Sequence, residues 1–497
     1  MNKSTGPKHF PAWLRNLGWL CFILLGLATV LLVARWWLME GAHQTAMELG
    51  KQGGELSKGS SKNGMAGDAI SSAHQESVTS RGTPVAELPL VGVYAGDDLT
   101  AQKGLGKQLE EIRRLMKDSV SACRVDGVLS FRAVLAKMGM AVPEGMTEAE
   151  AATEFLKQTE RFSDMLARWR EAVGKGAWDF SSVETNDSYA MRSKIFRLAF
   201  PLQCLLGVMA EAHLRTGDMV AAYSDLQTMD SSADRCGDMP GFFKQNLSYQ
   251  MFRTAHAGME LGAWTDTQLM GISTMLGEEN ALASMRRLMD FQKLQQADFF
   301  THFREHQSEI QDSFSHSKSP IDQMINQIGI ATTTDQQLAD NLAVINFQID
   351  QPFTRFDPVT GVYLGESAGD SRELPHSKPS DVSFDKFYYM YSEMYGGHQG
   401  SVAQQIIKDQ STIDQTRIAA ALEMQLQATG EYPETLDAVS GTFGGAIPRD
   451  IATGQPYFYQ RDADGGYTLW GTGIDQKSDG GNEEHDVTWK HRPAKKK

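Results

Sequence analysis

The chain has 497 residues and a formal charge of −15, and 41% of its residues are hydrophobic. This length leaves room for two or three domains, and the acidic balance argues against a general nucleic-acid binder. The four cysteines include no CxxC pair, which argues against a zinc site.

Residues 17–39 are the first clear feature, an apolar run that carries no charge before Arg35. Its uncharged part is long enough to nearly span a hydrocarbon core, and Trp36 and Trp37 lie where an interfacial aromatic belt belongs. Basic residues precede the run, which places residues 1–16 in the cytoplasm. We expect a single-pass anchor in the inner, cytoplasmic membrane with the bulk of the chain outside the cytoplasm. A cleaved signal peptide is the alternative.

Residues 40–92 change sharply in composition and consist largely of Gly, Ser, Ala, Gln and Lys. Such a segment cannot bury enough apolar surface to offset the entropy of ordering it. We expect a flexible linker with a root-mean-square reach on the order of 40 Å.

The next segment, 93–345, is predicted to be an α-helical domain. Thr147 and Glu150 have the spacing of a capping box, and apolar residues recur at helical spacing after them. Two segments around Gly217 and Gly262 each read as a helix, a turn and a second helix. Hairpins at this spacing suit a solenoid of the tetratricopeptide-like kind, and a plain helical bundle explains the pattern as well.

Two short strings match catalytic signatures, one in this domain and one in the connector predicted over 346–400. GESAG at 365–369 has the GxSxG pattern of a nucleophile elbow with Ser367, and HFREH at 302–306 has the HxxEH pattern of inverted zinc peptidases. The elbow lacks a following helix, because two prolines come soon after it, and the zinc motif lacks an identified third ligand. A membrane-tethered hydrolase that uses Ser367, or His302 with His306, is therefore the alternative function.

The C-terminal segment, 401–491, has the strongest local signals. A helix is predicted with Ser411 or Thr412 as its cap and Asp414 near its positive end, and Gly430 is predicted to end it. Two aromatic strands, 456–459 and 467–470, flank a turn-rich insert of hairpin length. A glycine- and aspartate-rich loop follows over 473–481, and the segment closes with the sequence DVTW.

This segment resembles the C-terminal part of the major pseudopilin of type II secretion systems and related pilin-like domains of bacterial envelope proteins. The resemblance is carried by AALEMQLQATGEYPETLDAV, IPRD, the YFY and YTLW strands and GTGIDQKSDGGNEEHDVTW. In that family the final loop binds calcium, so the resemblance implies Asp475 and Asp486 as ligands, with Asp479 and loop carbonyls as additional donors. Carboxylates separated by a glycine-rich loop are able to fold around one calcium ion. A solvated acidic turn is the alternative.

The sequence thus predicts a mainly α fold with a small α+β C-terminal module. In this fold class an N-terminal transmembrane helix leads to a bundle or solenoid-like body and a pseudopilin-head-like end. We expect a non-enzymatic envelope protein that binds or scaffolds other envelope proteins, with a calcium-stabilised end and a link to type II secretion-like machinery. No nucleic-acid partner is expected, and homo-oligomerisation is left open.

Overall fold

The computed structural model describes residues 47, 83–84, 87–95, 99–116, 123–125, 128–176, 178–179, 188–235, 241–301, 333–365, 402–463 and 465–492. The chain divides into two compact units. The first comprises Met1–Lys58, Gln296–Asp350 and Ser371–Gln399, and its described part is helix α15 (Asp335–Asp350) with the end of α12 (Ala281–Thr301). The second comprises Gly59–Gln295, Gln351–Asp370 and Gly400–Lys497 and is described below.

Most of the second unit is helical. Its helices before α12 are α3 (Val91–Ala95), α4 (Leu99–Met116), α5 (Phe131–Lys137), α6 (Glu148–Thr159), α7 (Ser163–Gly174), α8 (Ser188–Thr216), α9 (Met219–Arg235), α10 (Gly241–Glu260) and α11 (Asp266–Gly277), with a 3₁₀ turn η3 (Glu160–Phe162) between α6 and α7. Two short ladders accompany them, β1 (Thr83–Pro84) parallel to β4 (Trp178–Asp179) and β2 (Arg124–Val125) antiparallel to β3 (Val128–Leu129). Leu88 and Leu90, from the end of the predicted linker, are buried in the core.

The capping box predicted at the start of α6 is confirmed. The Thr147 hydroxyl accepts a hydrogen bond from the Glu150 amide at 3.2 Å, and the Glu150 carboxylate accepts one from the Thr147 amide at 2.7 Å. These bonds satisfy two amides that a helix start leaves unpaired. The apolar residues that follow at helical spacing, from Phe155 to Trp169, are buried.

Helical hairpins stack along the unit. Gly217 joins α8 to α9 and Gly262 joins α10 to α11, both with positive φ of 83° and 57°. Helix α10 packs against both helices of the preceding hairpin. Gly271 in α11 leaves room for the ring of Tyr223 in α9, since a Cβ there would lie 1.9 Å from the tyrosine hydroxyl. Each helix thus depends on its neighbours in the stack for burial.

The C-terminal part consists of helix α18 (Val402–Thr429), the 3₁₀ helix η6 (Leu436–Phe443) and strands β5 (Phe458–Arg461), β6 (Tyr467–Gly471) and β7 (Val487–His491), while η4 (Gln351–Arg355) precedes them. The strands form an antiparallel sheet in the order β5-β6-β7. The two predicted aromatic strands are confirmed, with β5 placed slightly later than expected. Gly430 ends α18 as predicted, with φ of +84°.

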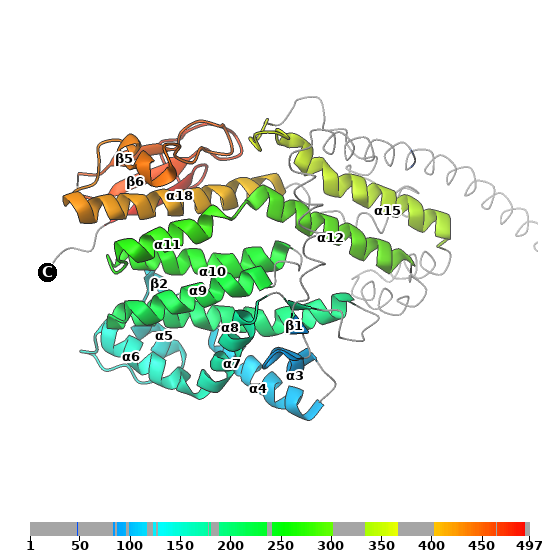
Figure 1. The fold of residues 1–497 in the computed structure, drawn as a ribbon, viewed down its shortest axis with the longest axis horizontal. Coiled ribbons are helices and arrows are strands. Elements are labelled where there is room, and N and C mark those ends of the chain that lie inside the picture. The colour runs from blue at the N-terminus through cyan, green and yellow to red at the C-terminus, as the bar shows by residue number, and fades with distance from the viewer. Residues whose placement is uncertain are drawn as a thin grey trace, which may run out of the picture. The chain divides into compact units, whose positions relative to one another are not determined.

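The predicted start of α18 is wrong. The helix begins at Val402, so Ser411 is buried within it and the Thr412 hydroxyl donates to the Lys408 carbonyl. Nearly every residue from 411 to 423 is buried, because the helix is covered on two sides. The sheet lies on one side and α10 and α11 lie on the other (Figure 1).

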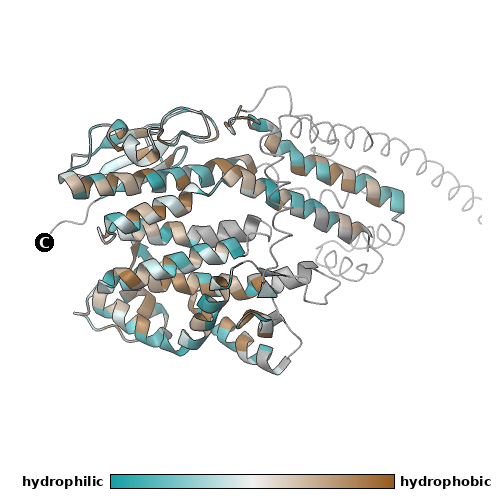
Figure 2. Ribbon diagram, in the orientation of Figure 1, coloured by the Kyte–Doolittle hydropathy of each residue, from teal (hydrophilic) through white to brown (hydrophobic). Residues whose placement is uncertain are grey.

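The predicted fold class, which included an N-terminal transmembrane helix, is also wrong for the residues that the structure describes. Among the described helices, none combines the length and the apolar character that crossing a membrane requires. Hydrophilic and hydrophobic residues alternate along the long helices (Figure 2), as expected where one face packs and another meets water or a polar partner. Residues 17–39 themselves lie outside the described residues. What the structure has is a largely helical chain with a small three-stranded antiparallel sheet at its C-terminal end.

Candidate functional site

The predicted calcium loop connects β6 to β7. Asp486, at its end, is buried, and its Oδ2 accepts hydrogen bonds from the amides of Asp479 at 3.0 Å and Gly481 at 2.8 Å. Asp475 is exposed, and its Oδ1 accepts the Lys477 amide at 3.1 Å. Two of the three predicted ligands therefore shape the loop through hydrogen bonds to backbone amides.

A residue that the sequence did not single out fixes this loop in place. Gln476 has a positive φ of 60°, and its side-chain amide donates to the carbonyls of Tyr363 at 3.0 Å and Ala452 at 2.6 Å. Its partners lie 113 and 24 residues away in sequence, so no local pattern indicates its role.

The donor set fits calcium in part. The Oδ1 of Asp486 is buried without a hydrogen-bond partner, which suits a metal ligand. Calcium takes about six to eight oxygens. Within the described ranges, however, no three His, Cys, Asp or Glu side chains are grouped closely enough to hold a metal. Asp486 is thus placed as a ligand would be, but the side chains of Asp475, Asp479 and Asp486 do not form a three-carboxylate group.

The residues of the alternative hydrolase, Ser367, His302 and His306, lie outside the described residues. The segment that leads to Ser367 is described as far as Gly365. In it Tyr363 forms an isolated antiparallel bridge with Phe356, and a turn lies between them. A nucleophile elbow follows a parallel strand of a large sheet, and this segment has a different geometry. The hydrolase stays an untested alternative.

The junction between the sheet and the helices holds a buried ionisable cluster, which we call the Glu-His-Glu cluster: Glu260, His491 and Glu423. The Nδ1 of His491 in β7 lies 2.9 Å from Glu260 Oε1 in α10, and its Nε2 lies 3.5 Å from Glu423 Oε1 in α18. The Tyr432 hydroxyl donates to the same Glu423 oxygen at 2.6 Å. Burial raises the pKa of Glu423, while His491 and the Tyr432 hydrogen bond oppose this rise.

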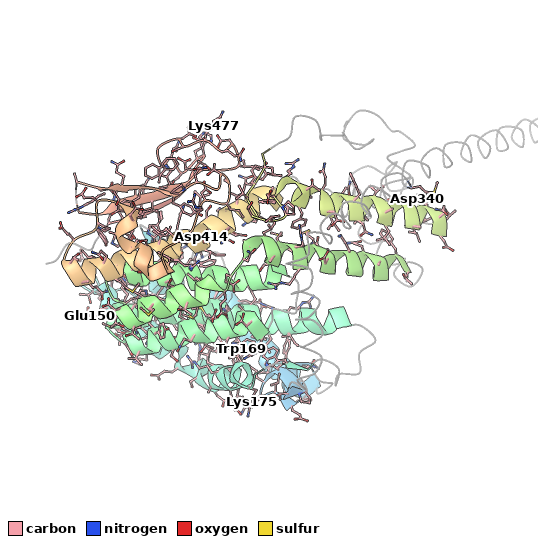
Figure 3. All side chains as sticks on the ribbon, turned by 45° about the horizontal axis from the view of Figure 1, so that its top comes forward. Glu150, Trp169, Lys175, Asp340, Asp414 and Lys477 are labelled. Carbon is pink, nitrogen blue, oxygen red and sulfur yellow. The ribbon has the colours of Figure 1, made fainter. Side chains whose placement is uncertain are left out.

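A second buried carboxylate, Asp414, lies in α18 on the N-terminal side of Glu423. Figure 3 shows it where the helix passes the sheet, whereas Lys477 lies in the outer loop. Asp414 accepts hydrogen bonds from the Gln410 amide at 3.2 Å and the Tyr457 hydroxyl at 3.1 Å. Burial raises its pKa to about 7, and these hydrogen bonds oppose the rise. The Asp450 carboxylate, also buried, accepts the amide and hydroxyl of Thr472 at 2.9 and 2.7 Å.

Neither cluster was predicted from the sequence. Glu260 and His491 are 231 residues apart. Asp414 was placed near the positive end of the helix because the start of α18 was misplaced. Asp414 is surrounded in the sequence by other polar residues, so no local pattern marked it as a buried group.

No family model, curated protein or solved structure matches this chain. The resemblance of the C-terminal segment to pseudopilins therefore stays a prediction.

Proposed function

We propose that this chain is a non-enzymatic, protein-binding scaffold whose stacked helical hairpins present an apolar contact to a protein partner. One observation carries the proposal: Val220 and Met270 are 78% and 58% exposed at the starts of α9 and α11. The Gln268 side chain donates to the Met219 carbonyl at 3.1 Å, which holds these two helix starts together. Stacked hairpins commonly bind proteins, and exposed apolar side chains on neighbouring hairpins favour such a contact.

The arrangement of the charged groups supports the same proposal. The carboxylates of Glu211, Asp225 and Glu423 are buried, and each lies beside a basic side chain, of Arg124, Arg170 and His491 respectively. Carboxylates in these positions are screened from a substrate, and removing the basic partner of any of them would leave a buried charge uncompensated. Placement in the bacterial envelope and a link to type II secretion-like machinery rest on the C-terminal resemblance and stay predictions.

The proposal is tested by site-specific photo-crosslinking in the native cell. A photoreactive residue at Val220 or Met270 should give the same discrete protein adduct, whereas one at Val359 should not. Val359 is a matched control because it is a valine with the same 78% exposure in a different part of the unit. With the photoreactive residue at Val220, Met270→Asp should weaken the adduct, and with it at Met270, Val220→Asp should do the same; neither change should alter the melting temperature. Identical adducts at Val359, or none at Val220 and Met270, would contradict the proposal.

We further propose that calcium binds the loop of Asp486, with Asp475 and loop carbonyls as further donors. Thermal unfolding of the full chain should shift upward with millimolar calcium relative to chelator, because a ligand that binds only the folded state stabilises it. Asp475→Asn should remove the shift, and Asp437→Asn, at another exposed aspartate, should keep it. An equal shift in both variants, or no shift in the unmodified chain, would argue against the site.

A further inference from the structure

Both ring nitrogens of His491 face carboxylates. Nδ1 lies 2.9 Å from Glu260 Oε1, and Nε2 lies 3.5 Å from Glu423 Oε1. A neutral imidazole has one N–H group and an imidazolium has two. His491 is therefore able to donate to both carboxylates at once only when it is protonated.

The surroundings of His491 are buried and aromatic. The ring of Tyr467 in β6 stacks on the imidazole, with centroids 5.1 Å apart and planes at 25°, and the ring of Tyr432 meets it edge-on at 5.8 Å. The side chain of His491 is 2% exposed, and those of Glu260 and Glu423 are 10% and 6% exposed. Water is therefore poorly placed to replace a lost hydrogen bond.

The titratable groups that face the cluster come from each element packed against it. They are His256 and Glu260 from α10, Glu423 from α18, Tyr432 after α18, Tyr467 from β6 and, beyond His256, Arg124 from β2. Burial lowers the pKa of His256, which favours its neutral form. Arg124 is paired with Glu211, with a hydrogen bond of 3.2 Å. The carboxylates and a protonated His491 thus carry one net negative charge, and loss of the His491 proton leaves two.

We propose that the Glu-His-Glu cluster is a pH-sensitive clasp that holds β7, and with it the C-terminal sheet, against α10 and α18 only while His491 is protonated. As the pH rises and His491 loses its proton, two carboxylates stay buried beside a ring with a single N–H group, and the clasp weakens. As the pH falls far enough for Glu423 to take up a proton, the ion pair on that side is lost. The clasp is therefore strongest in a window between these two protonation steps.

Hydrogen–deuterium exchange of the full chain tests the clasp through the amides of β7. After correction for intrinsic exchange, protection of Val487–His491 should fall at least tenfold from its maximum on raising the pH. His491→Gln keeps a side-chain amide that donates from one nitrogen but carries no charge, so it should show low protection without this pH response. Glu423→Gln removes one of the two charges, so it should lose the decline on the acid side.

Asp414 is the necessary control, because it also titrates in this helix and its pKa of about 7 falls in the same range. Asp414→Asn should keep the pH response of β7. A response that disappears in Asp414→Asn and persists in His491→Gln would overturn the clasp, as would constant protection in the unmodified chain.

A second measurement keeps the proposal open to refutation if His491→Gln fails to fold. Nitrogen-15 spectra of the histidines in the unmodified chain should show both ring nitrogens of His491 protonated wherever β7 is protected. A neutral ring across that whole range would overturn the proposal.

Discussion

Asp414 and Glu423 lie in the same helix and are both buried, but they differ in their surroundings. Asp414 receives hydrogen bonds from the neutral side chains of Gln410 and Tyr457, whereas Glu423 lies beside His491. Burying an ionised carboxylate is costly, and a protein reduces the cost by neutralising the group or by pairing it with a cation. With the proposed clasp, one helix uses both solutions, so Asp414 and Glu423 should respond differently to mutation and to pH.

The largest expected effect is the loss of the cation. In the proposed clasp His491→Ala removes the positive partner of two buried carboxylates, and at a pH where β7 is protected it should destabilise the unit by about 3–5 kcal/mol. Urea unfolding measures this loss. The double variant with Glu423→Gln should recover part of it, because one of the stranded charges is then absent. A loss below about 1 kcal/mol would mean that His491 is not the counter-ion of this cluster.

Asp414→Asn should have the opposite effect on stability and raise the free energy of unfolding above neutral pH. The folded chain holds the Asp414 proton more tightly than the unfolded chain, because its pKa is raised from 3.8 to about 7. This stabilisation is complete below the unfolded pKa and is lost as the pH rises through about 7. Asparagine keeps the shape without the charge, so at pH 8 it should be more stable than aspartate by at most about 4 kcal/mol.

The extra stability of Asp414→Asn is checked by measuring how it depends on pH. Unfolding free energies of the two forms should converge towards pH 4, where the native aspartate is neutral. An Asp414→Asn variant that is less stable than the unmodified chain at pH 8 would contradict the neutralisation of Asp414.

The same substitution at two tyrosines compares the surroundings of Asp414 and Glu423 directly. Tyr432→Phe and Tyr457→Phe each remove one hydroxyl that donates to a buried carboxylate. A hydrogen bond to a charged group contributes about 1.5–3 kcal/mol. The loss for Tyr457→Phe should grow between pH 6 and pH 8 as Asp414 ionises, whereas that for Tyr432→Phe should change less. Equal pH dependence in chemical denaturation would contradict the distinction.

Short sequence patterns predicted the features that depend on a few neighbouring residues and did not predict the buried clusters. The glycine at position 430, the aromatic strands and the capping box at Thr147 follow from backbone and turn chemistry over a few residues. The start of α18 was misjudged because Ser411 and Thr412 suit a helix cap as well as a buried helix interior, where Thr412 bonds to the preceding turn.

The clusters depend on long-range packing. Nothing in the sequence near Glu260, at the end of α10, distinguishes it. Its partner His491 lies in a strand 231 residues later in the chain. The same holds for Gln476, whose two carbonyl partners come from other loops. Such contacts appear only when the sheet is placed on α18 and α18 on the helical stack.

The smallest expected effect on stability comes from replacing two glutamines, one near each end of α18. Gln410 accepts a hydrogen bond from the Ala281 amide at 2.9 Å and donates one to Asp414, while Gln427 donates to the Trp264 carbonyl at 2.8 Å. Replacing either by alanine should cost about 0.5–1.5 kcal/mol for each hydrogen bond lost. Because the Gln410 bond to Asp414 favours the charged carboxylate, the cost of Gln410→Ala should be larger at pH 8 than at pH 5. The cost of Gln427→Ala should be the same at both, since its partner does not titrate. If the two variants keep a constant difference across this range, the Gln410 hydrogen bond does not stabilise ionised Asp414, and burial alone governs that end of the helix.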